Sequence, residues 1–75
     1  MRKILKLKIV EYFDSQERFS TNLQRLGVTG IDATLISRII RQHRNPTPAQ
    51  ADAFVKLLHT PIDQLMKGDD DYYVV

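Results

Sequence analysis

The sequence contains no cysteine and no tryptophan, and it has only three glycines and three prolines in 75 residues. Without cysteine the chain forms neither disulfides nor cysteine-based zinc sites, which favours a cytoplasmic protein. Its apolar runs are far shorter than the roughly 20 residues that a membrane-spanning helix needs. The basic N-terminal segment is interrupted by lysines and is not followed by a small-residue cleavage site, so a secretory signal is not expected. We therefore expect a cytoplasmic protein without a membrane partner.

The charge is nearly balanced, with a net value of +2, 27% charged residues and 43% hydrophobic residues, as in an ordinary globular chain. The length suits one small domain, near the size at which a single core gives modest stability and dimerisation helps. The two signs are nevertheless segregated: basic residues gather at 2–8 and 38–44, and Asp69 to Asp71 lie near the end. Such local basic patches can contact phosphates although the whole chain is close to neutral.

Residues 32–46 have the pattern of a short amphipathic helix followed by a basic loop. Asp32 is a suitable N-cap, so the helix is expected to begin near Ala33. Four aliphatic residues recur at helical spacing and can bury one face: Leu35, Ile36, Ile39 and Ile40. The remaining arc is small, polar and cationic, and Asn45 before Pro46 must leave the helical conformation. The pattern predicts a helix with one buried face and one basic face.

Two helices are expected before this segment. Residues 1–13 combine a helical stripe with the alternation of a strand; we favour a helix, and an N-terminal strand paired across a dimer is the alternative. Asp14-Ser15 can end this element and cap a second helix, which Gly27 stops. Three residues of the second helix are expected in the core: Phe19, Leu23 and Leu26. The turn over 27–31 is longer than usual, and Val28 or Ile31 is expected to fill the core.

Two further helices are expected after residue 46. Thr47 and Gln50 have the spacing of a capping box, with Pro48 at the first helical position. A buried stripe follows: Ala51, Phe54, Val55 and Leu58. His59 ends this helix, and Thr60 is expected to cap a last helix by the same device. That last helix is expected to bury Ile62, Leu65 and Met66.

The run from Ile36 to Pro46 resembles the end of the recognition helix, and the loop after it, in the Cro/repressor (XRE-like) helix-turn-helix superfamily. The similarity continues through Thr47-Pro48 and 60–65, so it covers about half the chain. It implies an all-α, lambda-repressor-like domain of about five short helices over 1–68, followed by an acidic and aromatic tail over 69–75.

Two positions depart from the pattern of that superfamily. Glu usually stands at the position of Ile40, and Gly usually stands at the position of Gln42. The Gly serves a left-handed helix end, which a residue with a Cβ adopts less readily. The end of this helix can therefore differ in shape.

The resemblance also implies the residues that would contact DNA. The positions that face bases in the superfamily match Ala33, Thr34, Ser37 and Arg38. Those that lie near the DNA backbone match Arg41, His43, Arg44 and Asn45. Arg38 is the most informative of them, because its planar guanidinium can bind guanine O6 and N7 together. A solvated surface, or an ion pair with a helix carboxylate, is the alternative for Arg38 and Arg41.

The expected function is sequence-specific binding of double-stranded DNA, as in a phage- or plasmid-type repressor. Such domains usually act as homodimers on near-palindromic operators, with half-sites about one helical turn, roughly 34 Å, apart. Two alternatives stay open: a DNA-binding antitoxin of a toxin-antitoxin pair, and a helix-turn-helix fold used for protein interaction. The tail is expected to be either disordered or a dimerisation arm formed by Tyr72, Tyr73, Val74 and Val75.

Catalytic signatures are lacking. His43 and His59 lie far apart in the sequence and have no further histidine or repeated carboxylate nearby to complete a metal site. Ser37 has no adjacent base, and the glycines form no phosphate-binding pattern. We expect a protein that is not an enzyme and uses no cofactor, metal or small-molecule ligand.

Overall fold

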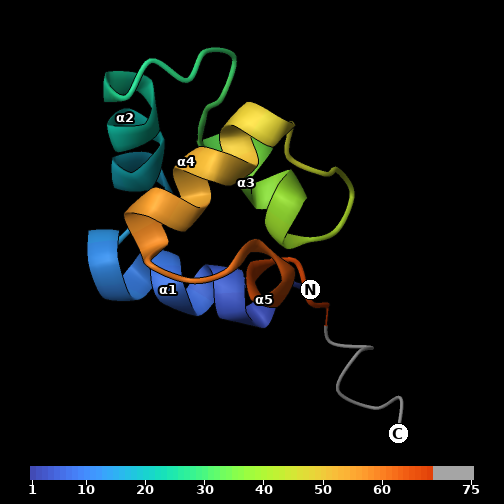
Figure 1. The fold of residues 1–75 in the computed structure, drawn as a ribbon. Coiled ribbons are helices and arrows are strands. Elements are labelled where there is room, and N and C mark those ends of the chain that lie inside the picture. Colours follow the sequence, from blue (N-terminus) through green and yellow to red (C-terminus); the bar gives the residue numbers. More distant parts are fainter. Residues whose placement is uncertain (69–75) are drawn as a thin grey trace, which may run out of the picture.

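The computed structural model describes residues 1–68, and all regular structure in that range is helical (Figure 1). The helices are α1 (Lys3–Phe13), α2 (Gln16–Arg25), α3 (Ala33–Ile40), α4 (Pro48–Leu58) and α5 (Ile62–Leu65). This confirms the predicted all-helical class and the helical interpretation of the N-terminal segment. The residues expected in a dimerisation arm, Tyr72 to Val75, lie outside the described range. No helix within residues 1–68 is long and apolar enough to cross a bilayer.

Three helices begin at side chains that accept hydrogen bonds from the free backbone amides of the first turn. The Ser15 hydroxyl caps α2, and the Asp32 carboxylate caps α3 through the backbone N–H of Leu35 at 2.8 Å. Thr47 and Gln50 form the complete capping box at the start of α4. These caps were all predicted, because each acts within three residues of its own position.

The start of α5 differs from the prediction. Pro61 stands at the N-cap position, where it makes no side-chain cap. The Thr60 hydroxyl instead donates to the carbonyl of Leu58 at 2.8 Å, at the end of α4. The predicted Thr60 cap is therefore wrong, because this hydroxyl satisfies a carbonyl that the end of a helix leaves free. His59 ends α4 as predicted, with a left-handed φ of 50°.

The core lies where α1, α2, α3, α4 and α5 meet. Figure 1 shows α4 crossing in front of α3, with α1 below it and α2 to its left. Phe19 of α2 lies between Phe13 and Phe54, with ring centroids 5.3 and 5.2 Å away. The other buried apolar residues surround this cluster: Leu5, Ile9, Leu23, Ile31, Ile36, Ile39, Ile40, Ala53, Leu58 and Leu65. Most of the predicted core is confirmed, but Ala51 and Val55 of the predicted stripe on α4 are only half-buried, whereas Ala53 is buried.

Leu26 is the main error in the predicted core. It is 54% exposed, although it is the C-cap of α2 and keeps a helical backbone that donates to the carbonyl of Asn22. Ile31, in the loop between α2 and α3, is buried, while Val28 is half-buried against the same core. The long loop is therefore anchored to the core just before α3 begins.

We predict that Phe19→Ala lowers the free energy of unfolding by about 3–5 kcal/mol, the usual cost of truncating a buried phenylalanine. That loss is a large part of the roughly 5–15 kcal/mol that stabilises a typical domain. Urea denaturation followed by circular dichroism measures it. The matched control is Leu26→Ala, which should change the free energy of unfolding by no more than about 0.5 kcal/mol, as exposed sites do. Equal losses in both variants would contradict the described core.

Candidate nucleic-acid interface

The outer face of α3 is polar and cationic. Ile36, Ile39 and Ile40 bury the inner side of the helix, while Thr34 and Arg38 are exposed on the outer side. Arg41, the residue that follows the helix, is exposed as well. This amphipathic division was predicted. It presents donor groups on a helix whose inner face is fixed by the core.

Two of the four residues expected to face bases line one hollow with a loop residue. Thr34 and Arg38 line a hollow of about 240 Å³ together with Asp32 and Arg44. Ala33 and Ser37 are half-buried. Ala33 also lines a second hollow, with Val10 of α1 and Asp14, the C-cap of that helix. The structure thus brings Thr34 and Arg38 together with the loop residue Arg44.

The end of α3 has the left-handed geometry that its sequence made doubtful. Gln42 adopts a φ of 66°. Its backbone N–H donates to the carbonyl of Ile39 at 3.1 Å, and that of His43 donates to the carbonyl of Arg38 at 2.9 Å. These two bonds form a Schellman motif with glutamine in the usual place of glycine. The helix end is therefore not reshaped by the substitution.

Contacts of the Gln42 side chain account for a glutamine at this strained position. The Met1 amino group donates to Gln42 Oε1 at 3.0 Å. The amide also lies against Gly68, where a Cβ would collide with it. The side chain therefore links the start of the chain, the end of α3 and the segment after α5. A glycine would leave these contacts unmade, although it would relieve the backbone.

Arg2 is the functional residue that the sequence did not reveal. It is counted among the N-terminal basic residues in the sequence, yet it is 7% exposed. Its Nη1 donates to the carbonyls of Ile39 at 2.9 Å and Arg44 at 3.0 Å. Its Nη2 donates to Asn45 Oδ1 at 2.7 Å, and its Nε donates to the carbonyl of Met66 at 3.2 Å. The guanidinium thus holds the end of α3, the following loop and the end of α5 in one arrangement. We call this set of hydrogen bonds the Arg2 clamp.

The environment of Arg2 suits a buried cation. The last carbonyls of a helix carry partial negative charge, and the Arg2 backbone N–H also donates to the carbonyl of Ile40 at 2.6 Å. Burial lowers the pKa of the Arg2 guanidinium below its ordinary value. That value is so high that the group stays protonated in proteins. No local pattern marks this role, because every acceptor is far away in the sequence.

The loop after α3 presents a mixture of free and engaged groups. His43, Arg44 and Asn45 are all exposed residues. The Asn45 side-chain oxygen accepts a hydrogen bond from Arg2, which leaves both amide N–H groups and one further acceptor site of the oxygen to contact another molecule. Arg44 is held through its main-chain carbonyl, which leaves its side chain available. Arg2 therefore fixes the main chain of the loop, while the cationic side chain of Arg44 stays exposed.

Arg38, Arg41 and Arg44 make no ion pair with any carboxylate within residues 1–68. The two exposed ion pairs of that range lie elsewhere: Lys8 with Glu11, and Arg18 with Asp14. The ion-pair alternative for Arg38 and Arg41 therefore finds no support in this part of the chain. Asp32 borders the same hollow as Arg38 and Arg44 without pairing with either, so the hollow keeps a net positive charge, which attracts polyanions.

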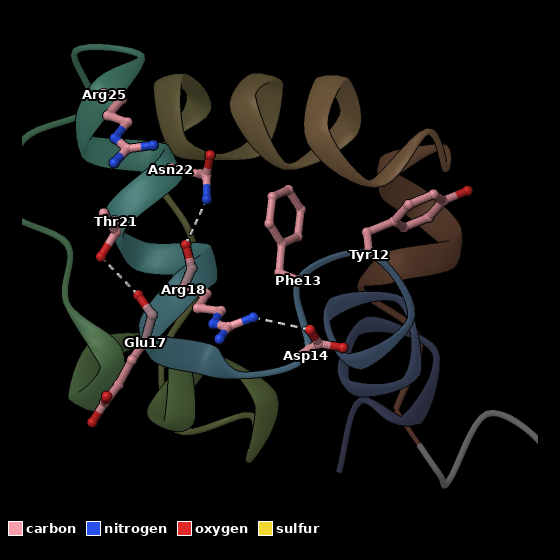
Figure 2. Close-up of a pocket in the computed structure, with 8 residues that line it drawn as sticks. All are labelled: Tyr12, Phe13, Asp14, Glu17, Arg18, Thr21, Asn22 and Arg25. Carbon is pink, nitrogen blue, oxygen red and sulfur yellow. Dashed lines mark hydrogen bonds and ion pairs between the residues drawn. The ribbon is translucent and has the colours of Figure 1, made fainter.

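Another, larger hollow, of about 510 Å³, is lined by the end of α1 and by one side of α2 (Figure 2). Several of its polar groups are engaged: Arg18 pairs with Asp14 at 3.1 Å, and Asn22 donates to the carbonyl of Arg18 at 2.8 Å. Arg25 and Glu17 also line the hollow, one with a cationic and one with an anionic side chain. Within residues 1–68, His, Asp and Glu side chains form no group that could hold a metal ion.

Comparisons of the chain with protein-family models, with curated proteins and with solved structures found no match. The residues and their geometry therefore carry the functional argument.

We predict that Arg2→Met lowers the free energy of unfolding by about 1.5–3 kcal/mol, the usual contribution of hydrogen bonds to a charged group. Arg2→Lys should not restore it, because one ammonium group cannot reach acceptors that a planar fork spans. The control is Lys6→Met on the exposed side of α1, for which a change within about 0.5 kcal/mol is expected. Thermal or urea denaturation compares the three variants. Indistinguishable midpoints for Arg2→Met and Lys6→Met would rule out the clamp.

Proposed function

We propose that this protein binds double-stranded DNA in a sequence-specific manner, with α2 and α3 acting as a helix-turn-helix and α3 lying in the major groove. The carrying observation is the outer face of α3, where Thr34 and Arg38 project from a helix packed against the core and Arg38 makes no ion pair with a described carboxylate. A helix of this kind fits the major groove, in which arginine can read guanine.

The loop after α3 is suited to contact phosphates while α3 reads bases. Arg41, His43 and Arg44 are exposed beside the helix end, and Arg44 borders the same hollow as Arg38. Cationic loop residues next to a reading helix contact phosphates, which fixes the register of the helix on the duplex. The Arg2 clamp fits this role, because a phosphate contact sets register only if its loop holds a constant position relative to α3.

The resemblance to the Cro/repressor superfamily points to the same use. Under this proposal the protein is a non-catalytic transcriptional regulator of phage or plasmid type, which occupies an operator as a homodimer. Two copies would read half-sites about one helical turn, roughly 34 Å, apart. Selection of bound sites from random duplex DNA tests specificity and symmetry together. Recovery of sequences without a shared motif would overturn the proposal.

We predict that Arg38→Ala loses about 1–3 kcal/mol of discrimination at one base pair of the selected site. Arg44→Ala should instead weaken binding to all sequences and reduce the salt slope by about one unit. Fluorescence anisotropy with matched and single-mismatch duplexes, at several salt concentrations, separates the two effects. Arg25→Ala serves as the control, because Arg25 is an exposed cation beside the hollow of Figure 2, away from the outer face of α3.

The control decides between recognition and general electrostatic attraction. If Arg25→Ala weakened binding as much as Arg44→Ala, the contact would depend on overall charge and not on the face of α3. Unchanged base preference in Arg38→Ala would place the reading element elsewhere.

A further inference from the structure

The outer side of α1 carries a stripe of four residues that described contacts leave largely open. Lys3, Leu7 and Val10 follow one another at intervals of four and three residues, so they lie on one side of α1, and Asp14 follows four residues later as the left-handed C-cap of that helix. Leu7 is 64% exposed and Val10 is 51% exposed. Leu7 is the most exposed large apolar side chain in residues 1–68. We call these four residues the α1 stripe.

The core does not use the α1 stripe. Leu5 and Ile9 form the buried side of α1 and are fully covered by the domain. Single exposed apolar residues are common on protein surfaces. Two adjacent apolar residues on one stripe, flanked by a cation at one end and an anion at the other, form a more specific pattern.

That pattern is complementary to itself when the helix is reversed. If two copies of α1 pack antiparallel about a two-fold axis between residues 8 and 9, Lys3 lies opposite Asp14 of the second copy. In the same arrangement Leu7 lies opposite Val10 of the second copy. Positions at alternating spacings of three and four form the seam of paired helices; here Leu7 and Val10 are its apolar centre and charged residues stand at its ends. A two-fold interface must also be self-complementary. A parallel arrangement would bring Lys3 against Lys3 and Asp14 against Asp14.

We propose that the α1 stripe is a dimer interface in which α1 packs antiparallel against α1 of a second copy. Each dimer contains two Leu7 to Val10 contacts and two Lys3 to Asp14 ion pairs. α1 is about 16 Å long at 1.5 Å per residue. The contact is therefore smaller than the roughly 800 Å² per partner of a standard interface, which makes the dimer weak and dependent on concentration.

The existing partner of Asp14 does not oppose this pairing. Asp14 Oδ2 contacts Arg18 Nη1 at 3.1 Å, and both side chains are more than two-thirds exposed. An exposed pair of this kind contributes little, and a carboxylate can accept from two cations. Lys3 has no ion pair within residues 1–68.

The α1 stripe also leaves the cationic face of α3 open. Val10 and Asp14 border the hollow that contains Ala33, whereas Thr34, Arg38 and Arg44 line another hollow. Pairing through α1 therefore covers the surroundings of Ala33 and not those of Arg38. The statement that such a dimer reads two half-sites rests on the proposed DNA-binding function. The proposed dimer interface does not depend on that function.

Sedimentation equilibrium of the full chain without DNA tests the interface over a range of concentrations. The natural sequence should show a monomer–dimer equilibrium, and Leu7→Glu should weaken it by about tenfold or more, since it places a charge in the centre of the contact. Leu26→Glu makes the same chemical change at a residue that is 54% exposed at the end of α2, and it should leave the equilibrium unchanged. Circular dichroism verifies that both variants keep the fold.

The direction of pairing is tested by disulfide trapping, because the chain contains no cysteine of its own. Equimolar Leu7→Cys and Val10→Cys variants, mixed under oxidised glutathione, should form more mixed disulfide than random pairing gives. A mixture of Leu26→Cys and Val10→Cys should not exceed random pairing. Homodisulfides of Leu7→Cys in excess would contradict the antiparallel arrangement.

Two results would overturn the proposal: a chain that stays monomeric at all concentrations, or a Leu7→Glu variant that sediments as the natural sequence does. Either result would mean that a second copy of the protein does not bind the α1 stripe. Failure of the DNA-binding proposal has a different signature, in which the chain dimerises through α1 yet selects no DNA motif. If both proposals hold, Leu7→Glu should keep its base preference on one half-site and lose cooperative binding to two.

Discussion

The arrangement of the domain depends on the buried guanidinium of Arg2. Three segments far apart in the sequence meet at this group, which donates to carbonyls of Ile39, Arg44 and Met66 and to the Asn45 side chain. A buried cation is costly unless acceptors surround it, so the guanidinium and these acceptors require one another. The end of α3 also supplies negative partial charge. The clamp thereby converts an irregular loop into a surface of constant shape beside α3.

Both ends of α3 are fixed in consequence. At the start, the Asp32 carboxylate caps the helix and the side chain of Ile31 is buried in the core. At the finish, Gln42 holds a left-handed conformation, and its side chain contacts Met1 and the surroundings of Gly68. A side chain on such a helix occupies a small set of positions, which recognition of a base edge requires.

The features that sequence reasoning predicted are those that act locally. Ser15, Asp32 and Thr47 bond amides three residues ahead, so their spacing alone indicates a cap. Arg2 could not be predicted, because its acceptors lie 37 to 64 positions away. Thr60 shows a limit of local patterns: it stands before proline as Thr47 does, but its hydroxyl is drawn to a carbonyl at the end of α4. That Arg44 borders the same hollow as Thr34 and Arg38 depends on the path of the loop after α3, which spacing within one helix does not contain.

The arginines of this domain have different roles. Each role follows from the partners of the side chain and not from the net charge of the protein. Arg2 holds the fold, Arg18 pairs with Asp14 on the surface, and Arg38 lacks an anionic partner in the described chain. The exposed faces of α1 and α3 also differ in the charges that they carry. Two copies of the α3 face would repel one another, since both are cationic, whereas the α1 stripe carries opposite charges at its ends. A second copy is therefore disfavoured at α3 and favoured at α1, so a nucleic acid and a second copy need not compete for the same surface.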